Sequence, residues 1–440
     1  MSARVRLLDI RPLRESRAFR DLWTGSAAAQ LGGQAATVAV LAQVWELTGS
    51  PVSTGAIGLA TGVPTVLFGL LGGALADSVD RRAVVRTTTA GQLLAALGLW
   101  GQALAANRNV LLLLALVATG AAFSALGAPA RRTLPVRLLP SDQVAAGLAL
   151  TSVSFQAAML AGPAMAGLLI ARWGFSAAYA AQAAAAALAM LSVIRLPAMR
   201  PGGADAANCG RRTGRGGGRR AERGGGCRPQ RGGWCRAEPG GWRVVLRRPT
   251  LWGSLATDLS ATLLAMPIAL FPLVNEVRFG GDPRTLGLFL SAVAVGGITA
   301  GLVSGTVTRR RRGGLVQLVA ASAWGVALAG FGLAGELWAA LACLAVAGAA
   351  DTVAVITRGA LIQLETPDAY RGRVSSVEHV IGVAGPELGN FRGGLLASAT
   401  SASFALVTGG LSAALVIAAV AAANAPLRTC RTRPAGLPTR

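Results

Sequence analysis

Residues 72–82 read Gly-Gly-Ala-Leu-Ala-Asp-Ser-Val-Asp-Arg-Arg and lie between two long apolar segments. Small residues about one helical turn apart, Gly73 among them, end the first segment and offer a face that another helix can approach closely. Asp77 ends the apolar run, and Arg81 and Arg82 follow it. Because basic loops stay on the cytoplasmic side, the stretch predicts a short cytoplasmic hinge between two membrane helices.

The composition excludes a pair of soluble domains. The 440 residues are 53% hydrophobic and only 14% charged, with a mean hydropathy of +0.53. The apolar stretches are about 20 residues or longer, the length that a helix needs to cross the hydrocarbon core. We expect an all-α integral membrane protein.

The formal net charge of +23 would suggest a nucleic-acid partner in a soluble protein. Here the arginines fall almost wholly in alternate loops, so they indicate topology and contact with membrane lipid. We expect a multi-pass protein of the plasma membrane with both termini and the central linker in the cytoplasm, and no nucleic-acid partner.

Twelve transmembrane helices are expected. The first six cover about residues 19–44, 53–76, 84–104, 110–130, 144–171 and 175–194. The second six cover about residues 251–274, 286–307, 315–333, 338–362, 374–398 and 404–423.

A change of composition divides the chain. Residues 197–249 contain a Gly- and Arg-rich stretch that has too few aliphatic side chains to order itself, and we expect a cytoplasmic linker. Its composition at 203–240 also fits a stretch translated out of frame. The remaining divisions are an N-terminal half at 1–196, a C-terminal half at 250–425 and a cytoplasmic tail at 426–440.

The two halves resemble each other in sequence. Arg132 and Arg358 form a repeat pair expected near the cytoplasmic side, and Asp142 and Asp368 follow them at the same offset. Two pseudo-symmetric six-helix halves around a central cavity are the expected architecture.

The hinge resembles the loop signature of the major facilitator superfamily, Gly-x-x-x-Asp-x-x-x-Arg-Arg. Its matching positions are Gly73, Asp77, Arg81 and Arg82, and the resemblance implies that they gate alternating access. From the residues alone, a charged cytoplasmic loop with no gating role is the alternative.

A second pattern lies in the fifth expected helix. Gly162, Pro163 and Gly167 resemble the exporter signature of proton antiporters in that superfamily. From the residues alone, Gly162 and Pro163 predict a helix kink, because proline frees a backbone carbonyl. Further stretches resemble the enterobactin-exporter-like branch, and these are Ala128–Arg132, Phe155–Gly167, Ala265–Pro272 and Arg371–Ser376.

Ionisable residues inside membrane spans are expensive, so each one is a functional candidate. Asp258 and Asp351 are the deepest isolated acids, and Glu387 is the next candidate for proton coupling. The structural alternative is that Asp258 or Asp351 pairs with an arginine or a helix end, and that Glu387 pairs with Arg392.

These features predict a secondary active transporter, a monomer that exports a small amphipathic molecule, a siderophore or a drug-like compound, by proton-coupled alternating access. Facilitated uptake is one alternative, and a non-transporting membrane receptor or scaffold is another. The sequence shows no nucleophile–His–acid set, phosphate loop or metal-ligand spacing, so we expect no enzyme, no cofactor and no metal. The small-molecule substrate and protons are the expected partners.

Overall fold

The computed structural model describes residues 9–78, 80–140, 143–195, 245–303, 312–366 and 370–430. Within these ranges it leaves out the side chains of residues 70–78, 81, 132–133, 135–137, 145, 371–373 and 375–376. The described part of the chain is almost wholly helical and contains no strand.

The N-terminal half begins with the short helix α1 (Arg11–Glu15). Five longer helices follow it, α2 (Arg17–Thr48), α3 (Pro51–Ser78), α4 (Arg81–Leu104), α5 (Val110–Leu138) and α6 (Val144–Ile194). Polar side chains cap the start of two of these helices. The Ser16 hydroxyl accepts from the N–H of Phe19 at the start of α2, and the Asp80 carboxylate accepts from the N–H of Arg82 at the start of α4.

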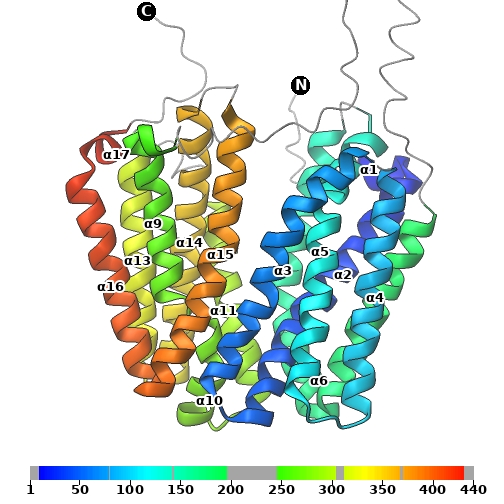
Figure 1. Cartoon of the computed structure of the whole chain (residues 1–440), viewed down its shortest axis with the longest axis horizontal. Coiled ribbons are helices and arrows are strands. Elements are labelled where there is room, and N and C mark those ends of the chain that lie inside the picture. Colours follow the sequence, from blue (N-terminus) through cyan, green and yellow to red (C-terminus); the bar gives the residue numbers. More distant parts are fainter. Residues whose placement is uncertain are drawn as a thin grey trace, which may run out of the picture.

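The C-terminal half opens with α9 (Pro249–Ala265), the 3-10 turn η1 (Ile268–Leu270) and α10 (Phe271–Phe279). It continues with α11 (Pro283–Leu302), α13 (Gly313–Leu333), α14 (Leu337–Glu365), α15 (Arg371–Ala399), α16 (Ala402–Ala423) and α17 (Ala425–Thr429). Figure 1 shows the two halves side by side, with α1 and α17 at the same end of the molecule and α10 at the opposite end.

The described helices make twelve membrane crossings. Eight stretches are long and apolar enough to cross a membrane, and one of them, Ala146–Ile194, has 49 residues, enough for two crossings. The more polar helices α2, α4 and α15 have 32, 24 and 29 residues, each more than the roughly 20 that a crossing needs. The expected twelve-helix fold in two six-helix halves is confirmed.

The chain reverses inside α6 at Gly174. This residue has φ 77° and ψ −176°, a conformation that is essentially restricted to glycine. Both arms of α6 run along α2, because Gly162 packs against the backbone of Leu31 and Ser192 packs against Gly25. The expected break between residues 171 and 175 therefore falls at one glycine rather than in a loop.

Two expected boundaries are wrong. The helix expected at 251–274 is interrupted, because Met266 has an extended backbone before Pro267 and proline disfavours the helical conformation in the residue before it. The helix expected to end near residue 130 continues to Leu138, which places Arg131 inside α5 rather than in a loop.

Candidate functional site

The two halves meet where α3 of the N-terminal half packs on α15 of the C-terminal half. Glycines on α3 let the backbones approach closely. A Cβ added to Gly58 would lie 2.6 Å from the carbonyl oxygen of Glu387, and one added to Gly55 would lie 3.0 Å from the carbonyl oxygen of Asn390. The Glu387 side chain itself packs on α3, because a Cβ added to Gly62 would lie 2.7 Å from the Cβ of Glu387. An acidic side chain of one half therefore packs against glycines of the other.

A second contact joins α6 to α11. A Cβ on Gly167 would lie 2.7 Å from the carbonyl oxygen of Pro283, and one on Gly287 would lie 2.5 Å from the carbonyl oxygen of Pro163. The Ser291 hydroxyl donates to the carbonyl of Leu160 at 2.9 Å. The glycine–proline pattern thus lies where the halves touch. Helical dihedral angles continue through Pro163, and the non-helical residue of α6 is Gly174.

We call these two contacts the seam. Its residues come from the start of α3, the last part of α15, the stretch of α6 before Gly174 and the start of α11. Among the described residues, every hydrogen bond and close glycine contact between the halves lies in this region, away from the end that carries α1 and α17. The halves are therefore joined at one end of the bundle.

A charged cluster lies inside the C-terminal half. Asp258 of α9 forms an ion pair with Nη1 of Arg358 of α14, and the two side chains are 12% and 10% exposed. Glu378 of α15 places its Oε1 3.4 Å from Nε of Arg358. One guanidinium thus joins carboxylates from two other helices, which is the arrangement that keeps charges tolerable away from water.

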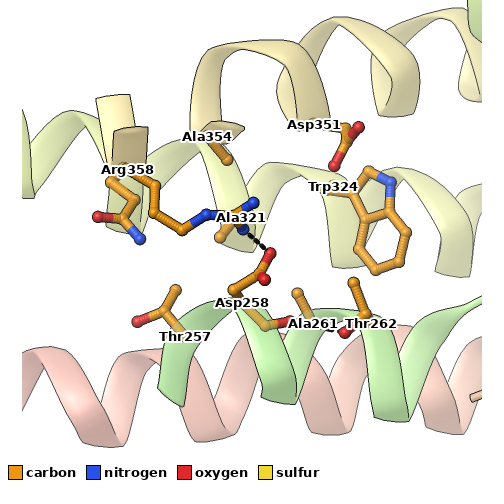
Figure 2. A pocket seen from close by; sticks show the side chains of 10 residues that line it. Thr257, Asp258, Ala261, Thr262, Ala321, Trp324, Asp351, Ala354 and Arg358 are labelled. Atoms are coloured by element: carbon orange, nitrogen blue, oxygen red, sulfur yellow. Dashed lines mark hydrogen bonds and ion pairs between the residues drawn. The ribbon is translucent and has the colours of Figure 1, made fainter. Parts of the chain in front are cut away.

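Asp351 lies on the same helix as Arg358, seven residues away, or roughly 10 Å along α14. It is exposed and lines one pocket with Asp258, Arg358 and Trp324. Figure 2 shows Asp351 and the Trp324 ring beside the Asp258–Arg358 ion pair. The pocket therefore combines an exposed carboxylate, a buried ion pair and an aromatic face.

The expected site residues are thus distributed over three places. Asp258, Asp351 and Arg358 share the pocket in the C-terminal half, and Arg358 lies in α14, within the helix expected at 338–362. Glu387 lies in the seam and not in the pocket, and Arg392 does not pair with it, because its Nη1 donates to the carbonyl of Leu264 at 2.6 Å.

The hinge signature is described only in part. The side chains of Asp77, Arg81 and Arg132 lie outside the described residues, and the roles expected for these residues and for Gly73 stay predictions. Arg82 donates to the carbonyl of Ile194 at 3.3 Å, at the end of α6, where a cation offsets the helix dipole.

The structural alternative for Asp258, pairing with an arginine, is what the structure shows, and the partner is Arg358. Sequence reasoning did not identify that partner or the contact of Glu378 with it. The sequence repeat between the two halves identified Arg358 as a candidate. No pattern along the chain connects it with Asp258, which lies 100 residues earlier. Among the described residues, no group of three His, Cys, Asp or Glu side chains is placed to hold a metal ion.

The chain is similar to known proteins over most of its length. The sequence model of the Major Facilitator Superfamily matches residues 22–390. The enterobactin exporters EntS of Citrobacter koseri and Shigella flexneri are each 24% identical to this chain over 418 residues, covering 93% of it and 94% of the exporter.

Solved structures show the same fold at low sequence identity. The nucleoside transporter NupG superposes with a TM-score of 0.68 at 14% identity, covering 93% of this chain and 99% of that protein. A bacterial homologue of the human lysosomal transporter Spinster, in an inward-facing conformation, gives 0.65 at 16% identity, covering 97% and 100%. The chain belongs to the major facilitator superfamily, and it is a multi-pass membrane transporter for a small molecule rather than an enzyme.

Proposed function

We propose that this transporter exports a small amphipathic molecule, a siderophore or a drug-like compound, in exchange for protons that move inward. Export is favoured by the coverage of nearly the whole chain by relatives that are enterobactin exporters. The glycine–proline pattern at Gly162, Pro163 and Gly167 resembles an exporter signature of the superfamily, with Ala158 in the place of an upstream glycine, and this resemblance supports the same direction.

The seam supports alternating access. If the arginine-rich termini are cytoplasmic, as the charge distribution predicts, the seam closes the outer end and the structure is an inward-open state. Opening the outer end then requires α3 to leave α15 and α6 to leave α11. Asp77 and the arginines of the hinge would bias the two states from the cytoplasmic end.

One observation carries the proposed coupling, namely that Asp258, Asp351 and Arg358 share one pocket. Two carboxylates, Asp258 and Glu378, contact the guanidinium and Asp351 shares the pocket, so the cluster carries excess negative charge when all three are ionised. A proton on one acid removes that excess and changes which carboxylate Arg358 holds. Since Arg358 joins α9, α14 and α15, the change acts on the packing of three helices.

Siderophore export tests the proposal. We would express the chain in a bacterium that makes enterobactin but lacks its own exporter, and measure enterobactin in the medium with and without a protonophore. Asp258→Asn and Asp351→Asn should each lose gradient-driven export. Glu336→Gln, an exposed acid before α14, should retain it. Full gradient-driven export by both Asp variants would place the coupling site elsewhere, with Glu387 next to be tested.

The identity of the substrate is itself part of the proposal. A second experiment therefore measures the conformation of the protein without any substrate. Purified protein in lipid nanodiscs, with spin labels at the seam end of each half, should change its distance distribution between pH 5.5 and 8. The response should be lost in both Asp variants, and a pH response that persists in both would contradict the assigned acids.

A further inference from the structure

A pocket lies between the two halves at the seam end, apart from the proposed coupling site. It takes in about 860 Å³ of space, part of it open to solvent. Its walls come from the last turns of α2 and the second arm of α6 in the N-terminal half, and from α10 and the start of α11 in the C-terminal half. Opening the outer end pulls these walls apart, so the pocket has this form only while the seam is closed.

Each half supplies one acidic residue to the pocket, and each acid lies in the last turn of its helix. Glu46 is two residues from the end of α2, and Glu276 is three residues from the end of α10. Both residues are exposed. The C-terminal end of a helix carries partial negative charge, which favours cations and disfavours carboxylates. The two acids and the two helix ends therefore give this pocket a negative potential.

No basic residue lines the pocket beside these acids. Among the described residues, neither acid takes part in an ion pair. Arg278 lies in the last turn of α10 but is directed elsewhere, because its guanidinium donates to the carbonyls of Gly332 and Ala334 at 2.5 and 2.6 Å. The described helix ends that adjoin undescribed residues lie with α1 and α17 at the opposite end of the molecule (Figure 1). The two acids are thus open to a cation from solution.

A buried amide adds an unused acceptor to the same pocket. Asn275 lines the pocket at 3% exposure, and its Nδ2 donates to the carbonyl of Asp282 at 2.9 Å. The chain turns here through Gly280 and Gly281, which have φ 75° and 74°. The Oδ1 of Asn275 is buried and accepts no hydrogen bond in the described structure. An unpaired buried acceptor costs stability, so a hydrogen-bond donor from a ligand is favoured at this atom.

The groups that line the pocket favour an organic ammonium ion. Trp45 of α2 and Phe175 of α6 add aromatic surface, which attracts organic cations as the carboxylates do. A primary ammonium also carries N–H donors, which match the carboxylate and amide acceptors of the lining. A divalent metal ion instead needs about six oxygen ligands around it. Among the described residues, no three His, Cys, Asp or Glu side chains are placed to hold one.

We infer that this pocket binds primary organic ammonium ions from the side that the charge distribution predicts to be external. Because its walls belong to both halves, a bound ion favours the state with a closed outer end over the open one. The site therefore lets an external amine slow the transport cycle. It is separate from the pocket of Asp258 and Arg358, and it goes beyond the proposed export function.

Protection of an introduced thiol tests the binding without transport. In a full-length variant without native cysteines, Ala42→Cys places a thiol in the pocket wall, and neutral N-ethylmaleimide labels it. Millimolar 2-phenylethylammonium should slow this labelling, whereas 2-phenylethanol, which has the same ring and no charge, should not. Glu46→Gln and Glu276→Gln should each weaken the protection about two- to fivefold, the range typical of exposed charge pairs. The double variant should lose most of it.

Glu336→Gln is the matched control. Glu336 is an exposed acid before α14, close to the carbonyls that Arg278 holds at the seam end, and it does not line the pocket. Its substitution should leave the protection intact. Equal protection by the alcohol, protection that survives the double variant, protection by calcium but not by the ammonium, or a thiol at position 42 that the reagent does not reach would each overturn the inference.

Distance measurements test whether the bound ion joins the halves. Spin labels at Arg108→Cys and Thr400→Cys, exposed residues of the two halves at the seam end, report on the outer end in lipid nanodiscs. With Gly58→Ala crowding the seam, saturating 2-phenylethylammonium should reduce the share of long distances. An unchanged or larger share would refute the preference for the closed outer end. Neither measurement uses a proton gradient or a transported substrate, so a failure of the proposed function leaves both results unaffected.

Discussion

Gly58 is the residue at which the seam can be perturbed most directly. A Cβ there would lie 2.6 Å from the carbonyl oxygen of Glu387 and 3.0 Å from its Oε2. Both distances are shorter than ordinary contacts, so Gly58→Ala forces α3 and α15 apart wherever the seam is closed. Overpacking of a well-packed contact costs about 1–3 kcal/mol.

That cost falls on one state of the transport cycle only, because the open outer end has no such contact. A bias of 1–3 kcal/mol changes the ratio of two states by about 5- to 150-fold. We therefore expect Gly58→Ala to raise the population with an open outer end by at least about fivefold, while the protein still inserts and folds.

The population can be measured in the full chain in lipid nanodiscs. Spin labels at Arg108→Cys and Thr400→Cys occupy exposed loops, one on each half, at the seam end. Double electron–electron resonance should show a larger share of long distances in Gly58→Ala. Gly69→Ala is the matched control on the same helix, since a Cβ there meets nothing within 4 Å. An unchanged distance distribution in Gly58→Ala, or an equal change in Gly69→Ala, would refute the reasoning.

Two further predictions concern the other end of the molecule. Asp77→Asn should impair export with normal expression, because the hinge carboxylate is proposed to bias two states rather than hold the fold; wild-type export in this variant would reduce the hinge to a topology signal. Burial and the neighbouring Glu365 carboxylate raise the pKa of the Cys430 thiol to about 11, so its alkylation by N-ethylmaleimide, followed by mass spectrometry, should still accelerate between pH 8 and 10. Glu365→Gln removes a negative charge, lowers that pKa and should speed the reaction at pH 8, and an unchanged rate would argue against the contact.

The fold followed from the sequence because membrane spans leave strong local signals. Length, apolar content and alternate arginine-rich loops predicted twelve helices in two halves, and the break before Phe175 was expected where the chain turns at Gly174. The interruption at Met266 was missed although Pro267 marks it, because hydropathy runs through both residues without a change. The end of α5 was missed because an arginine after an apolar stretch predicts the end of a membrane span. In the structure α5 continues through Arg131 to Leu138.

The site was less predictable, because it depends on which helix faces meet. Asp258 and Asp351 were identified as costly acids inside spans, but their relation to Arg358 depends on the packing of α9 against α14. For Glu387, a candidate for proton coupling, the structural alternative was an ion pair with Arg392 on its own helix. The Glu387 side chain instead packs on Gly62 of α3, and Arg392 donates to the carbonyl of Leu264 of α9, which no periodicity along α15 specifies.

The turn at Gly174 restricts how this gene can vary. Two crossings meet there without an intervening loop, at a backbone conformation that other residues essentially do not adopt. Its neighbour Trp173 is 64% exposed, so substitutions at that position should be tolerated. A substitution of Gly174 should instead strain the helical hairpin that holds both arms of α6 along α2. An epitope tag placed between these crossings should block membrane assembly, while the exposed turn at Arg108 should accept one.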